Sequence, residues 1–366
     1  MKSAKQKKSV RTTLFLFLTV FSILVSFVGC SQFSFLPDLG GNTDAPTDTD
    51  NTPDLPTIAP LDPTPTIYYN RYTGLACDKA LLSCRPISVC IGNFDEKRQE
   101  GLALADILVE APIDSEKTRL WAMFTDHRGA STLSSVATVR DYMMPTVSAF
   151  GAIGAYAGTT DKTGASATVY PGEHLDYLYH NLSATFTKEG EGALSTSMPL
   201  LIDAASSRGY SLTDTGISLP YRFAAPDTLY IPNSNRIRSI SFRYSMANTI
   251  GFRYDEKEAR YYREQAGAAH TDAGSGEQLS FSNLLLLFHN VNYYHTSTET
   301  TFALDTENGG SGYLYTGGGV VSVRWNYEDD GTLSVVNDEG EAITVNRGKT
   351  YIGMLRVTDS ASLIAK

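Results

Sequence analysis

A cluster of polar residues between two predicted strands carries residue types that acid–base or metal chemistry uses. Arg263, His270, Asp272 and Asn283 make up this cluster. His270 and Asp272 are two residues apart, so in an extended chain their side chains point the same way. The carboxylate could orient the imidazole, or the two side chains could ligate a metal ion. The alternative is a turn in which Asp272 caps backbone N–H groups and His270 is a surface residue.

A second set of polar residues lies within otherwise apolar, strand-like sequence. Asn93, Glu110 and Arg119 form this set, and Arg140 and Asp141 follow it along the chain. A guanidinium and a carboxylate in apolar surroundings commonly form a structural ion pair, because each charge needs a partner once it leaves water. Arg140 could hold an anion, and Arg140 and Asp141 are candidate functional residues together with the first cluster.

Two glycine-rich motifs resemble known sites but are incomplete. Gly348-Lys349-Thr350 has the end of a P-loop, yet the glycine required five residues earlier is Ile343, and a strand is predicted to follow instead of a helix. The segment Gly309–Tyr313 lacks the last glycine of a nucleophile elbow and is predicted to be a hairpin loop. The sequence therefore holds no complete catalytic constellation, and we expect no cofactor.

The elements that must position these residues fall into two predicted domains. In residues 67–215, strand patterns alternate with helical ones. A short helix running into a strand is predicted over 102–109, and further helices over 141–150 and 195–207. Alternation of this kind predicts a mixed α/β domain.

Residues 216–366 consist mostly of short alternating runs separated by turn residues, which predicts a mostly antiparallel β domain. The strongly apolar segment 284–291 is predicted to be a central strand. Three prolines, Pro220, Pro226 and Pro232, cluster near the boundary of the two domains. The predicted fold class is therefore α+β, with the mixed domain first and the β-rich domain second.

The first 29 residues have the features of a lipoprotein signal peptide. A positively charged start precedes the apolar stretch Leu14–Val28, which is shorter than the roughly 20 residues that span a membrane. Cys30 follows the small residue Gly29, as at a site where the thiol receives a diacylglycerol and becomes the new N-terminus. An uncleaved anchor and an ordinary signal peptide are the alternatives. We expect a lipid on Cys30 and localisation on the outer face of the cytoplasmic membrane.

Residues 30–66 have the composition of a disordered tether. Seven of the 15 prolines lie there, mixed with Thr, Asp, Asn and Gly, so the segment cannot bury enough apolar surface to fold. The whole chain carries a net charge of −10. Without the five positive residues of the signal and the six Asp of the tether, the remainder is mildly acidic and has no basic stripe. Nucleic acid is therefore not an expected partner.

A series of short motifs follows in a fixed order over residues 70–357. They are Asn70–Leu75, Arg85-Pro86, Asn93, Gly101-Leu102, Glu110-Ala111, Thr118-Arg119, Arg140–Tyr142, Tyr262-Arg263, Gly267, His270, Asp272, Asn283, Gly310–Gly312, Trp325 and Gly348–Tyr351. Their order and spacing resemble the YerB-type lipoprotein family of Gram-positive-type bacteria, which has two linked domains and no known activity. The chain departs from the family at Ala137, where the family has an Arg, and at Gly192–Ser197, which lacks a Pro-His pair.

The features together predict a membrane-anchored, non-enzymatic protein of the cell envelope. The tether, the two domains and the incomplete motifs favour binding of a cell-wall polymer, a peptide or another envelope protein. The alternative is a hydrolase or metal-dependent enzyme acting on envelope material. His270 and Asp272 would be its centre, and Arg263 or Arg140 would hold an anion. A third possibility is a structural partner in a division or sporulation complex.

Overall fold

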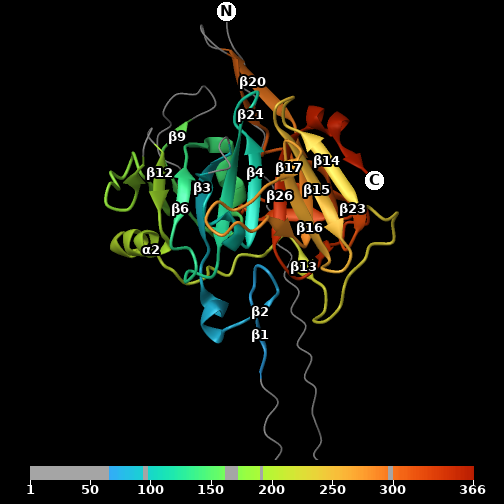
Figure 1. The fold of residues 1–366 in the computed structure, drawn as a ribbon, viewed down its shortest axis with the longest axis horizontal. Helices are drawn as coiled ribbons and strands as arrows, with labels where there is room; N and C mark the ends of the chain where they lie inside the picture. Colours follow the sequence, from blue (N-terminus) through green and yellow to red (C-terminus); the bar gives the residue numbers. More distant parts are fainter. Residues whose placement is uncertain (1–65, 94–97, 161–171, 190–192, 296–299) are drawn as a thin grey trace, which may run out of the picture. The chain divides into compact units, whose positions relative to one another are not determined.

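The computed structural model describes residues 66–93, 98–160, 172–189, 193–295 and 300–366 (Figure 1). All of them belong to one structural unit, Thr64–Lys366. The predicted lipidation site Cys30, the signal peptide and the tether up to residue 65 lie outside the described residues.

A mixed sheet of 13 strands dominates the described residues. Its main path runs, in spatial order, through β11 (Thr187–Lys188), β12 (Leu194–Thr196), β6 (Leu133–Val136), β3 (Ile87–Asn93), β5 (Thr118–Phe124), β4 (Ile107–Pro112), β26 (Thr350–Arg356), β19 (Asn283–His289), β22 (Gly310–Thr316), β23 (Gly319–Tyr327) and β24 (Leu333–Val336). Two further strands, β8 (Ile153–Tyr156) and β10 (His174–Asp176), extend it beside β3.

The centre of this sheet is apolar on both faces. Along β19, Leu284 and Leu286 pack into one core cluster, while Leu285 and Leu287 pack into another on the opposite face. Successive side chains of a strand point to opposite faces, so an unbroken apolar run is needed where both faces are covered. The prediction of a central strand at 284–291 is confirmed, because β19 pairs with β26 on one side and β22 on the other.

The two predicted domains share this one sheet. Strand β26 lies parallel to β4, with Thr350 opposite Ile107 and Gly353 opposite Glu110. The predicted boundary after residue 215 stays a prediction, but strands from both sides of it are hydrogen-bonded neighbours. The seam between β4 and β26 is where the polar residues of the two halves meet.

A second sheet covers one face of the first. It contains β17 (Ala268–Ala269), β16 (Arg260–Gln265), β15 (Thr249–Asp255), β14 (Ser239–Arg243) and β27 (Ile364–Ala365), with β18 (Ser280–Phe281) beside β16. Figure 1 shows β14 to β17 grouped beside β26. Aromatic rings fill the space between the sheets, and the ring of Tyr351 lies 4.9 Å from that of Phe252 and 5.6 Å from that of Phe281.

The other described elements are short. Four separate two-stranded sheets are present among the described residues: β1 (Tyr68–Tyr69) with β2 (Ala76–Cys77), β7 (Val139–Arg140) with β9 (Thr159–Thr160), β13 (Arg222–Phe223) with β25 (Thr344–Val345), and β20 (Val291–His295) with β21 (Thr300–Leu304). The helical segments are η1 (Lys79–Ser83), η3 (Leu102–Leu104), η4 (Asp141–Met143), α1 (Met144–Ser148), α2 (Met198–Ser207) and η6 (Val357–Ser362). Within the described ranges, no helix is long and apolar enough to cross a membrane.

The prediction of a mixed α/β domain over residues 67–215 is wrong. Strands account for 43% of the described residues and helices for 12%. The short helix predicted at the start of 102–109 is a single 3₁₀ turn, because Ala105 has an extended backbone, and the strand predicted to follow it is β4.

The helix predicted over 141–150 is also short. Pro145 stands near the start of α1, and Gly151 adopts a left-handed φ of 68° just beyond it. Proline favours the first turn of a helix and a left-handed glycine ends one, so little more than one turn fits between them. Helix α2, with 10 residues, is the longest of the described helices.

Candidate functional site

A buried ion pair joins the two halves of the chain at the β4–β26 seam. The Arg263 Nη2 atom on β16 donates to Glu110 Oε2 on β4 over 2.8 Å, and neither side chain is exposed. Tyr351 donates its hydroxyl to the same carboxylate oxygen over 2.8 Å. The other oxygen accepts from Asn93 at 2.9 Å and from Thr118 at 2.7 Å. Four donors therefore satisfy the carboxylate, as a buried charge requires.

The surroundings of Arg263 favour its charged form. Burial alone lowers the pKa of Arg263, but the Glu110 carboxylate and the Tyr351 hydroxyl raise it, so that the pKa lies above its ordinary value. Burial, followed by the charge of Glu110, raises the pKa of Tyr351 well above its ordinary value. Tyr351 is thus a neutral phenol that can only donate to the carboxylate.

His270 is buried beside Arg263 and not on the surface. Arg263 Nη1 donates to His270 Nδ1 and to Gln265 Oε1, the latter over 2.8 Å. A guanidinium has only donors, so Nδ1 must accept, and Nε2 then carries the proton that it donates to Gln99 Oε1 over 2.5 Å. Both ring nitrogens are occupied, and a proton on Nδ1 would place two cations in contact. This imidazole is held neutral by its neighbours.

Asp272 caps backbone amides instead of orienting His270. Its Oδ1 atom accepts from the N–H groups of Gly274 at 2.9 Å and Ser275 at 3.0 Å, and its Oδ2 atom accepts from that of Ala103 at 2.9 Å. The contacts match the turn that the sequence offered as the alternative for this residue. Within the described residues, no three His, Cys, Asp or Glu side chains are placed to share a metal ion.

The remaining candidate residues are dispersed. Arg119 donates from Nε to the Thr138 carbonyl over 3.0 Å and does not pair with Glu110, and burial lowers its pKa. Arg140 donates to the Thr160 hydroxyl over 2.9 Å. The sequence placed Arg119 beside Glu110, whereas the carboxylate takes its arginine from the other half of the chain.

Asp141 and Asn283 also lie apart from the Arg263 cluster. Asp141 accepts from the neighbouring Tyr142 N–H over 2.8 Å and lines a cavity of about 480 Å³ that also contains Asp305. Asn283 accepts from the Thr316 hydroxyl at 2.7 Å and from the Asn346 N–H at 2.9 Å. Its buried side chain therefore links β19, which contains Asn283, to β22 and to the segment that leads to β26.

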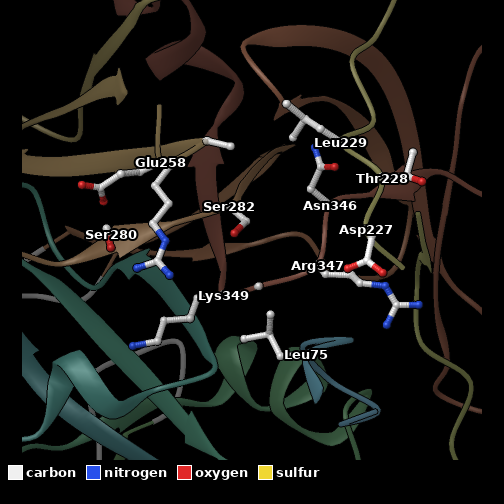
Figure 2. Close-up of a pocket in the computed structure, with 13 residues that line it drawn as sticks. Leu75, Asp227, Thr228, Leu229, Glu258, Ser280, Ser282, Asn346, Arg347 and Lys349 are labelled. Carbon is white, nitrogen blue, oxygen red and sulfur yellow. The ribbon is translucent and has the colours of Figure 1, made fainter. Parts of the chain in front are cut away.

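A cleft of about 490 Å³ is the feature that the sequence did not reveal (Figure 2). Five separate segments line it: Leu75, residues 227–229, residues 258–260, the serines at 280 and 282, and residues 346–349. No local pattern marks such a site, because its residues come from distant parts of the chain. The signal that was present is the Gly348-Lys349-Thr350 motif, which is not a P-loop but does line the cleft through Gly348 and Lys349.

Three basic side chains and two acidic ones line the cleft: Arg260, Arg347, Lys349, Asp227 and Glu258. Figure 2 shows the side chains of Arg347 and Lys349 running in opposite directions from the segment that bears them. The cleft thus carries a small positive excess in a chain with a net charge of −10.

The three cations differ in how firmly they are held. Arg347 donates from Nε to the Ala224 carbonyl over 3.0 Å, and its guanidinium lies 4.3 Å from the centre of the Tyr69 ring. Lys349 donates from Nζ to the Ala103 carbonyl, and burial lowers its pKa. Arg260 is exposed, and its guanidinium makes no hydrogen bond or ion pair with any described residue.

Residues 72–211 match the model of the "Protein of unknown function (DUF3048) N-terminal domain", and residues 240–352 match that of the corresponding C-terminal domain. The chain is 25% identical over 296 residues to "Putative lipoprotein YerB" of Bacillus subtilis (strain 168), covering 80% of this chain and 87% of that protein. It also resembles the crystal structure of the YerB protein from Bacillus subtilis with a TM-score of 0.67 and 22% identity, covering 82% of this chain and 99% of the other.

The structural likeness covers 82% of this chain, which is more than either half alone. The two domain matches lie on either side of the prolines near residue 220, in the order that the sequence motifs indicated. This chain belongs to the YerB-type lipoprotein family, whose two DUF3048 domains have no assigned biochemical function.

Proposed function

We propose that this chain is a lipid-anchored binding protein of the cell envelope, and that the cleft lined by Arg260, Arg347 and Lys349 is its ligand site. The single observation that carries the proposal is the cleft itself. It is large enough for a small ligand, since such sites typically measure about 300–1,000 Å³. It combines apolar surface with a few charged groups, which is the usual composition of a binding site.

The contacts of the polar cluster support binding over catalysis. A general acid or base must be able to exchange a proton with a substrate within hydrogen-bonding reach. Both nitrogens of His270 are occupied by Arg263 and Gln99, and both oxygens of Asp272 accept backbone amides. We therefore give this cluster the structural role of holding the two halves of the chain together.

The proposed localisation in the cell envelope is supported by the predicted lipoprotein signal at Cys30 and by the similarity to a putative lipoprotein. The tether of residues 30–66 would allow the folded unit to reach ligands away from the membrane surface, since Pro-rich chains extend by about 3.1 Å per residue. Candidate ligands are a cell-wall polymer, a peptide or another envelope protein.

The test uses the full-length protein in lipid nanodiscs and soluble fragments released from cell envelopes. We expect one or more fragment fractions to raise the melting temperature of the wild type, because a ligand that binds only the folded state stabilises it. The Arg260→Glu variant reverses a charge in the cleft and should lose this response. Lys257→Glu makes the same change three residues away, outside the cleft lining, and should keep it.

Two results would overturn the proposal. One is that no fraction shifts the melting temperature of the wild type. The other is that Arg260→Glu and Lys257→Glu respond as strongly as the wild type, since the ligand would then bind elsewhere. Mass spectrometry of the responding fraction identifies what is bound.

A further inference from the structure

Arg260 and Lys349 are two of the three cations that line the cleft. Burial is the main cause of the lowered pKa of Lys349, and the charge of Arg260 lowers it further, so the two groups are close enough to repel each other. Three carboxylates, those of Glu277, Asp106 and Asp272, act on Lys349 in the opposite sense. No described carboxylate forms an ion pair with Arg260. An anion that enters between the two cations would relieve their repulsion and satisfy the free guanidinium.

Apolar surface lies in the same cleft. Leu75 and Leu229 are each 45% exposed, although both line a concave site. Leucine side chains in such a position offer contact area to a ligand that has an apolar group of its own. A ligand that consists only of charged and hydroxyl groups would leave this surface without a partner.

The acidic residues of the cleft limit how much negative charge a ligand can bring. Asp227 and Glu258 lie among the lining residues (Figure 2). Closely spaced phosphates along a polymer would meet these carboxylates and be repelled. A ligand with a single anionic group avoids that repulsion, and the volume of about 490 Å³ suits a short molecule.

We infer that the cleft binds a short peptide through one free carboxylate, held between Arg260 and Lys349, and one apolar side chain, held against Leu75 and Leu229. The inference rests on the proposed function, because it names the ligand class of the same cleft. A guanidinium and a carboxylate can form two parallel hydrogen bonds, which gives such a site both affinity and direction.

The test is a calorimetric titration of the full-length protein in nanodiscs with a mixture of N-acetylated tripeptides that carry Leu, Val or Phe at each position. The same mixture with amidated C-termini is the matched probe. We expect the free acids to bind at least tenfold more tightly than the amides. We expect Arg260→Glu to weaken the free acids at least tenfold and to leave the melting temperature of the unliganded protein unchanged, because the side chain is exposed and unpaired.

Lys257→Glu is the control and should bind as the wild type does. Equal affinity for the free acids and the amides would contradict recognition of a free carboxylate. Tighter binding of sn-glycerol 3-phosphate than of the peptides would show that the cleft recognises a phosphate group instead. If an envelope fraction still shifts the melting temperature and the peptides do not displace it, the inferred ligand class is wrong but the proposed function stands. Failure of both the peptides and every envelope fraction would sink the proposed function as well.

Discussion

Glu110 and Arg263 are 153 residues apart in the sequence, yet their side chains meet at 2.8 Å with no exposure to solvent. The pair links the strand β4 of the large sheet to the strand β16 of the covering sheet. Such a pair is costly to break, because removing one partner leaves the other charge buried and uncompensated. The interaction therefore specifies how the two sheets are placed on each other.

Replacing Arg263 with Met should destabilise the protein by about 3–5 kcal/mol, because the Glu110 carboxyl group would be left buried without its partner. Urea unfolding of the two proteins measures the difference. Arg238→Ala is the control, since its ion pair with Glu256 is 3.3 Å long and both side chains are mostly exposed. That change should cost less than about 1 kcal/mol. A loss for Arg263→Met as small as that of the control would contradict a structural role for the pair.

Acid should weaken the fold through His289. Burial lowers the pKa of this imidazole to about 4, and its Nδ1 atom donates to the Asp305 carbonyl over 3.0 Å. An unfolded histidine titrates near pH 6.5. Between pH 6.5 and 4 the unfolded chain therefore binds a proton that the folded chain does not, so the free energy of unfolding falls as the pH falls, by up to about 3 kcal/mol. Above pH 6.5 this contribution is constant.

Measurements of unfolding free energy at pH 7 and pH 5 isolate this effect when a variant without the imidazole is included. His289→Asn keeps an N–H donor for the Asp305 carbonyl and should show a shallower decline with acid than the wild type. His295→Asn removes an exposed imidazole and should decline as the wild type does. Parallel slopes for all three proteins would show that His289 is not the group responsible.

Gly348 should not tolerate a side chain. Its φ is 135°, and a Cβ atom there would overlap the hydroxyl of Ser282, which also lines the cleft. We expect Gly348→Ala to cost about 3 kcal/mol from backbone strain and overlap together. Gly340→Ala provides the matched control, because its φ of 82° carries the strain but no atom lies within 4 Å of the added carbon. It should cost about 1–2 kcal/mol, and equal losses in urea unfolding would rule out the overlap.

The lipid should depend on Cys30 alone. Cells fed an alkyne-bearing fatty acid should label the wild type and the Cys77→Ser variant but not Cys30→Ser, because only Cys30 follows the apolar leader. Fractionation of the same cells should find the Cys30→Ser protein outside the washed membrane pellet. Undiminished labelling of Cys30→Ser would contradict the assignment of the anchor.

The sequence predicted the elements that depend on local pattern and failed where packing decides. Leu284 to Leu287 are apolar without alternation, and this alone indicated a strand covered on both faces. Residues 141–150 had helical spacing, but Pro145 and the left-handed Gly151 leave room for little more than one α-helical turn between them.

The site residues also divide into those that the local sequence indicated and those that only the packing brings together. The order of the family's motifs was visible in the sequence and led to the correct family. Glu110 was expected to pair with an arginine, because a buried carboxylate needs a cation. Arg119, the nearest arginine in the sequence, is not its partner. Arg263 reaches it only because β16 and β4 are brought together by the fold. The cleft was hidden for the same reason, since Leu75 and Lys349 belong to opposite ends of the folded unit.

The parallel pairing of β4 with β26 also has a consequence for biogenesis. The contact between Glu110 and Tyr351 spans 241 residues, so the sheet of the N-terminal half stays incomplete until β26 has been synthesised. During that interval β4 presents an open, apolar edge on which another chain could pair. Loss of β26 would leave that edge permanently open. Nonsense mutations that remove β26 should therefore yield aggregates and not shortened, working protein.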